Sequence, residues 1–164
     1  MKPSDRIFVA IDRMSAADAR ADIARVAGSG CGVKLGLEFF VANGPAVVRS
    51  VCPPEVPLFL DLKLHDIPNT VAGATRGACA AAPQLLTIHA SGGLAMMQAA
   101  VAAARETAGA APPNLLPITV LTSLDDGDLD AVGQRGPVAE QAKRLAALAQ
   151  RSGLDGVVCS AHEV

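Results

Sequence analysis

Short apolar runs alternate along this chain with longer alanine-rich stretches, and no other feature restricts its possible folds as strongly. The six runs lie at residues 7–12, 32–36, 57–63, 85–91, 115–123 and 156–160. The runs resemble buried strands, whereas the stretches between them carry apolar residues at helical spacing. Parallel strands cannot be joined by a tight turn and need a crossover connection, which is usually a helix. The alternation therefore predicts an α/β fold in which helices connect parallel strands.

Capping signals predict where two of the helices begin and end. Ser15 is suited to the N-cap of the first helix, and Gly28 is suited to ending it. The last helix is predicted over 138–151, with Gly153 directly beyond it. Residues 109–114 are predicted to form a loop. Both helices lie between apolar runs, as the alternation requires.

The length of the chain bounds its organisation. With 164 residues it is predicted to form a single domain, 1–164, of six strand–helix units. An eight-stranded βα barrel typically needs ~250 residues, with about 200 as the compact limit. An open, doubly wound sheet can be complete with six strands. Periodicity alone leaves both architectures open.

The composition excludes several classes of protein. Apolar residues make up 51% of the chain and charged residues 18%, which is typical of a folded core rather than of disorder. A net charge of −2 gives no reason to expect nucleic acid or an acidic membrane as a partner. The chain has no apolar run of ~20 residues and no signal peptide, so we expect a cytoplasmic protein. The cysteines are scattered and are predicted to be free thiols, not a disulfide or metal framework: Cys31, Cys52, Cys79 and Cys159.

The most informative stretch is the third apolar run. Side chains alternate across a strand, so Asp61 and Lys63 share one face with Phe59, while the other face is aliphatic. Charged groups in a buried strand cost several kcal/mol unless they are paired. The C-terminal edge of a parallel sheet is also where α/β proteins place their active sites. An acid and a base at this edge therefore indicate a functional site.

Polar side chains also occur near the C-terminal ends of other predicted strands. Asp12 ends the first, Lys34 lies in the second, His89 is near the end of the fourth, and Thr122 with Ser123 ends the fifth. Such a ring favours the mouth of a barrel over an open sheet. Each residue taken singly could equally be a capping residue at a turn. The group formed by Lys34, Asp61, Lys63 and Asp66 is better explained by function.

The three histidines suggest no catalytic or metal site of their own. His65 and His89 are interpreted as core residues or as supports for their neighbours. The spacing of the histidines and cysteines does not match that of a zinc site.

The residues at these positions resemble one enzyme family. The run Asp61-Leu62-Lys63-Leu64-His65-Asp66-Ile67-Pro68-Asn69-Thr70 is similar to the signature of the orotidine 5'-phosphate decarboxylases. The resemblance, which is to the bacterial form, extends over the whole chain. It includes the other strand ends: Val9-Ala10-Ile11-Asp12, Val33-Lys34-Leu35-Gly36, His89-Ala90-Ser91-Gly92-Gly93, Val120-Leu121-Thr122-Ser123 and Gly156-Val157-Val158-Cys159-Ser160.

The resemblance implies a fold, an activity and a partner. The fold is the (β/α)8 TIM barrel, of which this chain would hold about the first six units. The activity is decarboxylation of orotidine 5'-monophosphate to UMP, the last step of de novo pyrimidine biosynthesis, without any metal or organic cofactor. The enzyme would be a homodimer with sites near the subunit interface.

The resemblance also implies roles for individual residues. Lys34, Asp61, Lys63 and Asp66 would form a charged catalytic network in which Lys63 stabilises the C6 carbanion and then protonates it. Asp66 would reach into the partner's site. The remaining substrate contacts would be Asp12 to the ribose, Thr122 and Ser123 near the pyrimidine, and Ile67 and Thr70 beside Asp66.

The chain departs from the family pattern at its C-terminal end. Family members continue through two more strand–helix units, which carry a glycine-rich turn and an arginine that grip the 5'-phosphate. We therefore expect a truncated chain with little activity, whose complete form has ~225 residues. His162 stands where the family usually has glutamine.

Two alternatives remain beside decarboxylation of the nucleotide. One is a metal-dependent sugar-phosphate decarboxylase or synthase of the same superfamily, against which the continuation from His65 to Thr70 argues. The other is an inactive fragment that only dimerises or folds with a missing segment.

Overall fold

A parallel sheet forms the centre of the molecule. The computed structural model describes residues 2–163. Within them five strands pair side by side in the order β1-β2-β3-β4-β5. The strands are β1 (Phe8–Ile11), β2 (Gly32–Gly36), β3 (Leu58–Leu64), β4 (Leu85–His89) and β5 (Asn114–Ile118). The predicted parallel α/β architecture is therefore confirmed.

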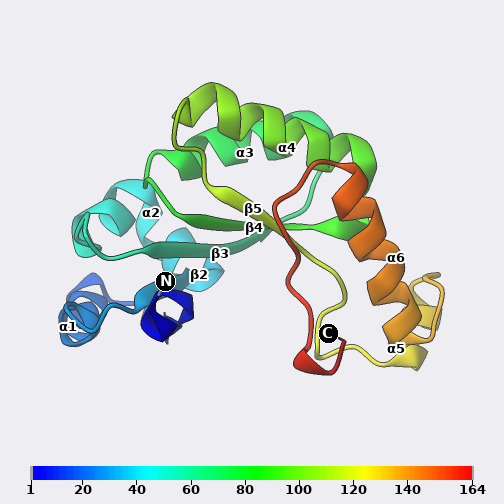
Figure 1. The fold of residues 1–164 in the computed structure, drawn as a ribbon, viewed down its shortest axis with the longest axis horizontal. Coiled ribbons are helices and arrows are strands. Elements are labelled where there is room, and N and C mark those ends of the chain that lie inside the picture. Colours follow the sequence, from blue (N-terminus) through cyan, green and yellow to red (C-terminus); the bar gives the residue numbers. More distant parts are fainter. Residues whose placement is uncertain (1, 164) are drawn as a thin grey trace.

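The strand order distinguishes between the two architectures that periodicity left open. Each strand lies next to the one before it, and the order never reverses as it does in a doubly wound sheet. Because βα crossovers are almost always right-handed, a sheet that grows in one direction places all its helices on the same side. Figure 1 shows the helices along one outer arc of the sheet. α1 and α2 lie at one end of the arc, α3 and α4 lie above the sheet, and α6 lies at the other end. The sheet thus has the topology of a TIM barrel, as expected.

The helices follow the strands as the alternation predicted. They are α1 (Ala16–Val26), α2 (Leu37–Val51), α3 (Pro68–Cys79), α4 (Gly93–Ala108), α5 (Asp126–Ala131) and α6 (Val138–Arg151). The Ser15 side chain caps α1 by accepting a hydrogen bond from the Asp18 amide, and α6 has the predicted bounds. A kink at Gly44 and Pro45 interrupts α2, since Gly44 has a φ of 76°. None of the helices in residues 2–163 is long and apolar enough to cross a membrane.

The prediction of a full sixth strand over 156–160 is wrong. This segment forms one isolated parallel bridge, between Ile118 and Val158, and β5 ends at Ile118 instead of continuing to residue 123. Val158 donates to the carbonyl of Pro117, and Thr119 donates to the carbonyl of Val158. Pro117 has no N–H to donate toward the same segment, so the ladder cannot extend backward along β5.

The core lies between the sheet and its helices. The alternate residues Leu58, Leu60 and Leu62 of β3 are all buried, as the face assignment predicted. Phe39 of α2 and Met96 of α4 are fully buried in the same cluster. Burial of one face of β3 leaves Asp61 and Lys63 on the opposite face. This face lies on the inner side of the arc of helices in Figure 1 and is called the concave face below.

Candidate active site

A charged network occupies the C-terminal half of β2 and β3. Lys34 Nζ lies 3.1 Å from Oδ2 of Asp61, and Lys63 Nζ lies 2.8 Å from Oδ1 of the same carboxylate. The register of the two strands causes this meeting, because Gly36 is paired with Asp61 and Lys34 with Phe59. The structure therefore brings together three of the four residues predicted for the network.

The Asp61 carboxylate is ionised because of its neighbours. Its side chain is only 13% exposed, and burial alone would raise its pKa. Hydrogen bonds from Lys63, Lys34 and Thr87 outweigh the burial and hold the pKa of Asp61 below its ordinary value. Two ammonium groups and one carboxylate leave an excess positive charge at this point of the concave face.

The backbone around Lys63 is irregular. The β3–β4 register shifts between Leu60 and Leu64, and Lys63 has a φ of 51°, which is uncommon for a residue other than glycine. The Lys63 amide donates to Oγ1 of Thr87 over 2.9 Å, and the Thr87 hydroxyl donates to Oδ1 of Asp61, also over 2.9 Å. The bulge thus lies at the network itself, where bulges commonly re-aim a side chain.

Two histidines stack beside the network. The rings of His65 and His89 are 5.3 Å apart at an interplanar angle of 34°. Burial lowers the pKa of His89 from its ordinary value, and the nearby His65 and Lys63 lower it further. His89 is therefore neutral at physiological pH, which agrees with the interpretation of this residue as a support rather than an acid.

Asp66 does not join the network within this chain. It lies in the exposed turn after β3, where its Oδ1 accepts a hydrogen bond from the Ile67 amide over 2.6 Å. In residues 2–163 it forms no ion pair with Lys34 or Lys63. Ile67 is 66% exposed, and Thr70 at the start of α3 is exposed too.

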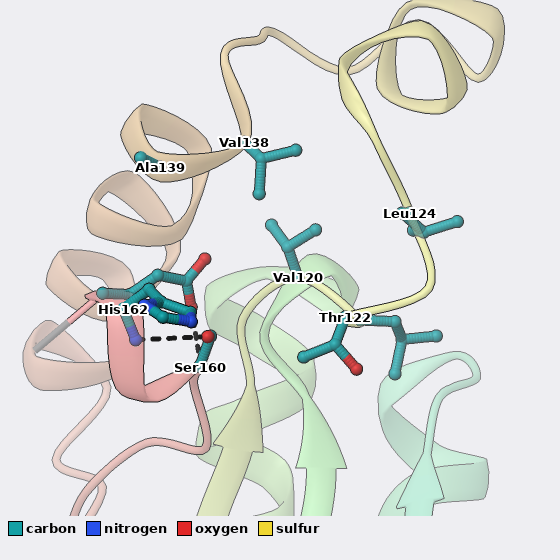
Figure 2. Close-up of a pocket in the computed structure, with 9 residues that line it drawn as sticks. Val120, Thr122, Leu124, Val138, Ala139, Ser160 and His162 are labelled. Carbon is teal, nitrogen blue, oxygen red and sulfur yellow. Dashed lines mark hydrogen bonds between the residues drawn. The ribbon is translucent and has the colours of Figure 1, made fainter.

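The remaining predicted residues lie along the same edge of the sheet. Asp12 is exposed directly after β1, while Thr122 and Ser123 are exposed in the turn after β5. Thr122 borders a cavity of about 320 Å³ between this turn, the start of α6 and the segment after the bridge at Val158 (Figure 2). None of the charged residues of β2 and β3 lines this cavity, and most of the residues that do are apolar.

Some residues of the site were missed from the sequence. Thr87 was not singled out, although a lone polar residue within Leu85-Leu86-Thr87-Ile88 has to find a partner if the strand is buried. Ser160 and Glu163 also border the cavity, and Glu163 accepts a hydrogen bond from the Ser160 amide. The position of Ser160 at the end of an apolar run was a usable signal.

The donor groups of the site are not arranged for a metal. In the described residues no three side chains of His, Cys, Asp or Glu are grouped so that they could hold a metal ion. Asp61 directs both of its oxygens at lysines and a threonine. All four cysteines are free, and burial raises the pKa of the Cys52 thiol to about 11.

Comparison with known proteins agrees with this geometry. Residues 5–164 match the model of the family described as "Orotidine 5'-phosphate decarboxylase / HUMPS family". The chain is 55% identical over 161 residues to an orotidine 5'-phosphate decarboxylase of Rhodospirillum rubrum, covering 96% of this chain and 65% of that protein. The corresponding protein of Paramagnetospirillum magneticum is 53% identical over 161 residues, with 96% of this chain and 68% of that protein covered.

A solved structure agrees as well. The crystal structure of orotidine 5'-phosphate decarboxylase from Lactobacillus acidophilus superposes with a TM-score of 0.86 at 35% identity, over 94% of this chain and 70% of that one. The chain thus spans about two thirds of the length of these relatives. The sequence, the strand topology and the charged network are all accounted for by one conclusion: this chain belongs to the orotidine 5'-phosphate decarboxylase / HUMPS family.

Proposed function

We propose that this protein decarboxylates orotidine 5'-monophosphate to UMP and that Lys63 supplies the proton. The single observation that carries the proposal is the Lys34–Asp61–Lys63 network on the concave face of the sheet. The names of its relatives from Rhodospirillum rubrum and Paramagnetospirillum magneticum, both orotidine 5'-phosphate decarboxylases, support the choice of substrate.

The chemistry explains why a cation has to be present. When the bond between C6 and the carboxylate breaks, the electron pair stays on C6 as a vinyl carbanion that no carbonyl can delocalise. A preorganised ammonium stabilises this charge as it develops, which is the largest catalytic effect in many enzymes. CO2 leaves in this step, and Lys63 Nζ then transfers a proton to the C6 carbanion, which gives UMP.

The neighbours of Lys63 prepare it for this role. Asp61 holds the ammonium of Lys63 on one carboxylate oxygen and that of Lys34 on the other. A substrate carboxylate placed beside Asp61 would meet an anion, which disfavours the ground state relative to the transition state. Lys34 keeps Asp61 ionised in turn.

The other predicted residues complete the proposal. Asp12 would bind the ribose, and Thr122 and Ser123 would lie near the pyrimidine. Asp66, together with Ile67 and Thr70, would enter the site of a second copy in a cytoplasmic homodimer. The exposure of these last three residues in the single chain is compatible with that arrangement.

The experiment follows the loss of substrate absorbance in the presence of EDTA. It compares these 164 residues with a chain extended to the length of the relatives, and each with its Lys63→Ala variant. We expect the extended chain to turn over and Lys63→Ala to reduce its kcat by at least about 10³-fold, since the reaction would lose its electrostatic stabilisation and its proton donor. Lys143→Ala is the matched control, because Lys143 is an exposed lysine of α6 that pairs with Glu140.

The other outcomes distinguish the alternatives. Turnover that survives in Lys63→Ala would contradict the role of Lys63. Absence of turnover in both chains, with activity on a sugar phosphate restored by magnesium, would favour the metal-dependent relatives. Activity in neither chain under either condition would favour a fragment without catalytic function.

A further inference from the structure

A bulge in β3 places a single residue of β4 opposite three residues of β3. Leu60 is paired with Leu86 and Leu64 with Ile88, so residues 61–63 face Thr87 alone. The two ends of the irregular segment are Asp61 and Lys63, the acid and the base of the charged network. Thr87 is therefore the residue of β4 that lies opposite the irregular backbone from which both side chains project.

The Thr87 side chain takes the place of the interrupted backbone ladder. Its Oγ1 accepts a hydrogen bond from the Lys63 amide, and its hydroxyl proton is donated to Oδ1 of Asp61. A hydroxyl has one proton to donate, so this pairing uses it fully. Thr87 is completely buried, and neither bond can be replaced easily by bulk water.

These two bonds act on the catalytic groups in different ways. The bond to the Lys63 amide holds a backbone conformation with a φ of 51°, which residues other than glycine rarely adopt. The bond to Asp61 fixes the rotation of the carboxylate, so that Oδ1 faces Lys63 while Oδ2 faces Lys34. A valine of the same shape would preserve the packing and remove both bonds.

We propose that Thr87 is a positioning residue, which sets the relative geometry of Asp61 and Lys63 through one hydroxyl bound to both. This inference rests on the proposed function only for its kinetic consequence. Its structural content, the orientation of the Asp61 carboxylate and of the Lys63 backbone, is independent of the substrate.

The test compares three variants of the chain extended to the length of the relatives. Thr87→Val removes the hydroxyl, Thr87→Ser keeps it, and Thr75→Val removes a hydroxyl that is buried in α3 without a hydrogen-bond partner among the described residues. The measurements are kcat and KM for orotidine 5'-monophosphate, and the pKa of Asp61 from the pH titration of its carboxyl ¹³C resonance.

We expect Thr87→Val to lower kcat by about 10- to 100-fold with a smaller change in KM, since a displacement of about 1 Å can cost on the order of 10²-fold. The pKa of Asp61 should rise, because a hydrogen bond to the charged form is lost. Thr87→Ser should restore most of both values, and Thr75→Val should change neither. A merely structural role would lower the thermal stability of Thr87→Val but leave its kcat at the value of Thr75→Val.

Two results would overturn the inference: a Thr87→Val protein with the kcat and Asp61 pKa of Thr75→Val, or a Thr87→Ser protein as impaired as Thr87→Val. If Thr87→Val does not fold, Thr87→Cys serves instead, since a thiol is a weak donor. If Thr87→Cys had the same kcat and the same Asp61 pKa as Thr87→Ser, the proposal would be contradicted. If the unaltered protein does not decarboxylate the nucleotide, the proposed function fails, whereas the Asp61 titration still decides the role of Thr87.

Discussion

At the scale of single residues, the site is governed by the competition between burial and pairing. Burial opposes the charge of Asp61, but two lysines and a threonine donate hydrogen bonds to it and keep it ionised. Burial also opposes the charged form of His89 and lowers its pKa. The nearby His65 and Lys63 lower this pKa further, and the opposing effect of Asp61 is smaller. The same part of the site thus favours a charged carboxylate and a neutral imidazole.

The lowered pKa of His89 predicts a pH dependence of stability. The unfolded chain binds a proton at His89 near its ordinary value of 6.5, whereas the folded chain binds it only at lower pH. The free energy of unfolding should therefore fall as the pH drops from 6.5 toward the folded-state pKa. Asp61 adds a separate loss at lower pH, as the solution falls below the ordinary carboxyl value of 3.8.

Urea unfolding at a series of pH values measures this effect. His89→Asn should remove part of the loss of stability just below pH 6.5, while the curves of the two proteins should run parallel at neutral and higher pH. An identical slope for both proteins below pH 6.5 would show that His89 titrates normally in the folded state.

At the scale of elements, close contacts between strands restrict the residues at their starts. Gly32 begins β2 between Phe8 of β1 and the loop before β3. A Cβ at Gly32 would lie 2.5 Å from the Phe8 ring and 2.8 Å from the carbonyl oxygen of Pro57. The ring can move, although it packs edge-on against Phe59, but the carbonyl belongs to the backbone that forms the ladder.

Gly32→Ala should therefore destabilise the chain by about 1–3 kcal/mol, as overpacking of a core does. Gly73→Ala is the matched control, because Gly73 lies in α3 with no heavy atom within 4 Å of the added Cβ. Gly73→Ala should raise the free energy of unfolding by about 0.5–1 kcal/mol, because alanine has a higher helix propensity than glycine. Chemical denaturation of both variants tests the pair, and equal effects of the two substitutions would contradict the close contact at Gly32.

At the scale of the whole molecule, the central and the outer strands of the sheet differ in the number of strands they pair with. β3 has partners on both sides, whereas β1 pairs only with β2 within the described residues. Val9 of β1 is 37% exposed, while Leu35 of β2 and Leu60 of β3 are fully buried. Local opening of an edge strand with few buried contacts requires less free energy than opening of the centre.

Native-state hydrogen exchange on the 164-residue chain should reveal this gradient. We expect the amides of β3 and β4 to exchange slowest and those of β1 to exchange faster, with β2 between them. Uniform protection across the sheet would indicate that the outer edge of β1 is covered in solution, for example by a second copy of the chain.

Local sequence patterns were sufficient for much of the fold. Alternating apolar runs predicted the parallel strands, since a buried strand and an amphipathic helix each leave their own period in the sequence. The bounds of β2 and α6 and the cap at Ser15 followed from the same local chemistry. The two faces of β3 could be assigned because side chains of a strand alternate regardless of its partners.

The tertiary structure decided whatever depends on how distant segments align. Lys34 and Asp61 are 27 residues apart, and Asp61 and Thr87 are 26 apart, so their bonds exist only because of the strand register. The bulge at Lys63 and the single bridge at Val158 likewise arise from pairing between strands. The sequence by itself determined that Asp61 and Lys63 share one face of β3, because the alternation of side chains along a strand is local. Only the tertiary structure decided which atoms meet there, because the free energy of a hydrogen bond depends on positions that no local pattern encodes.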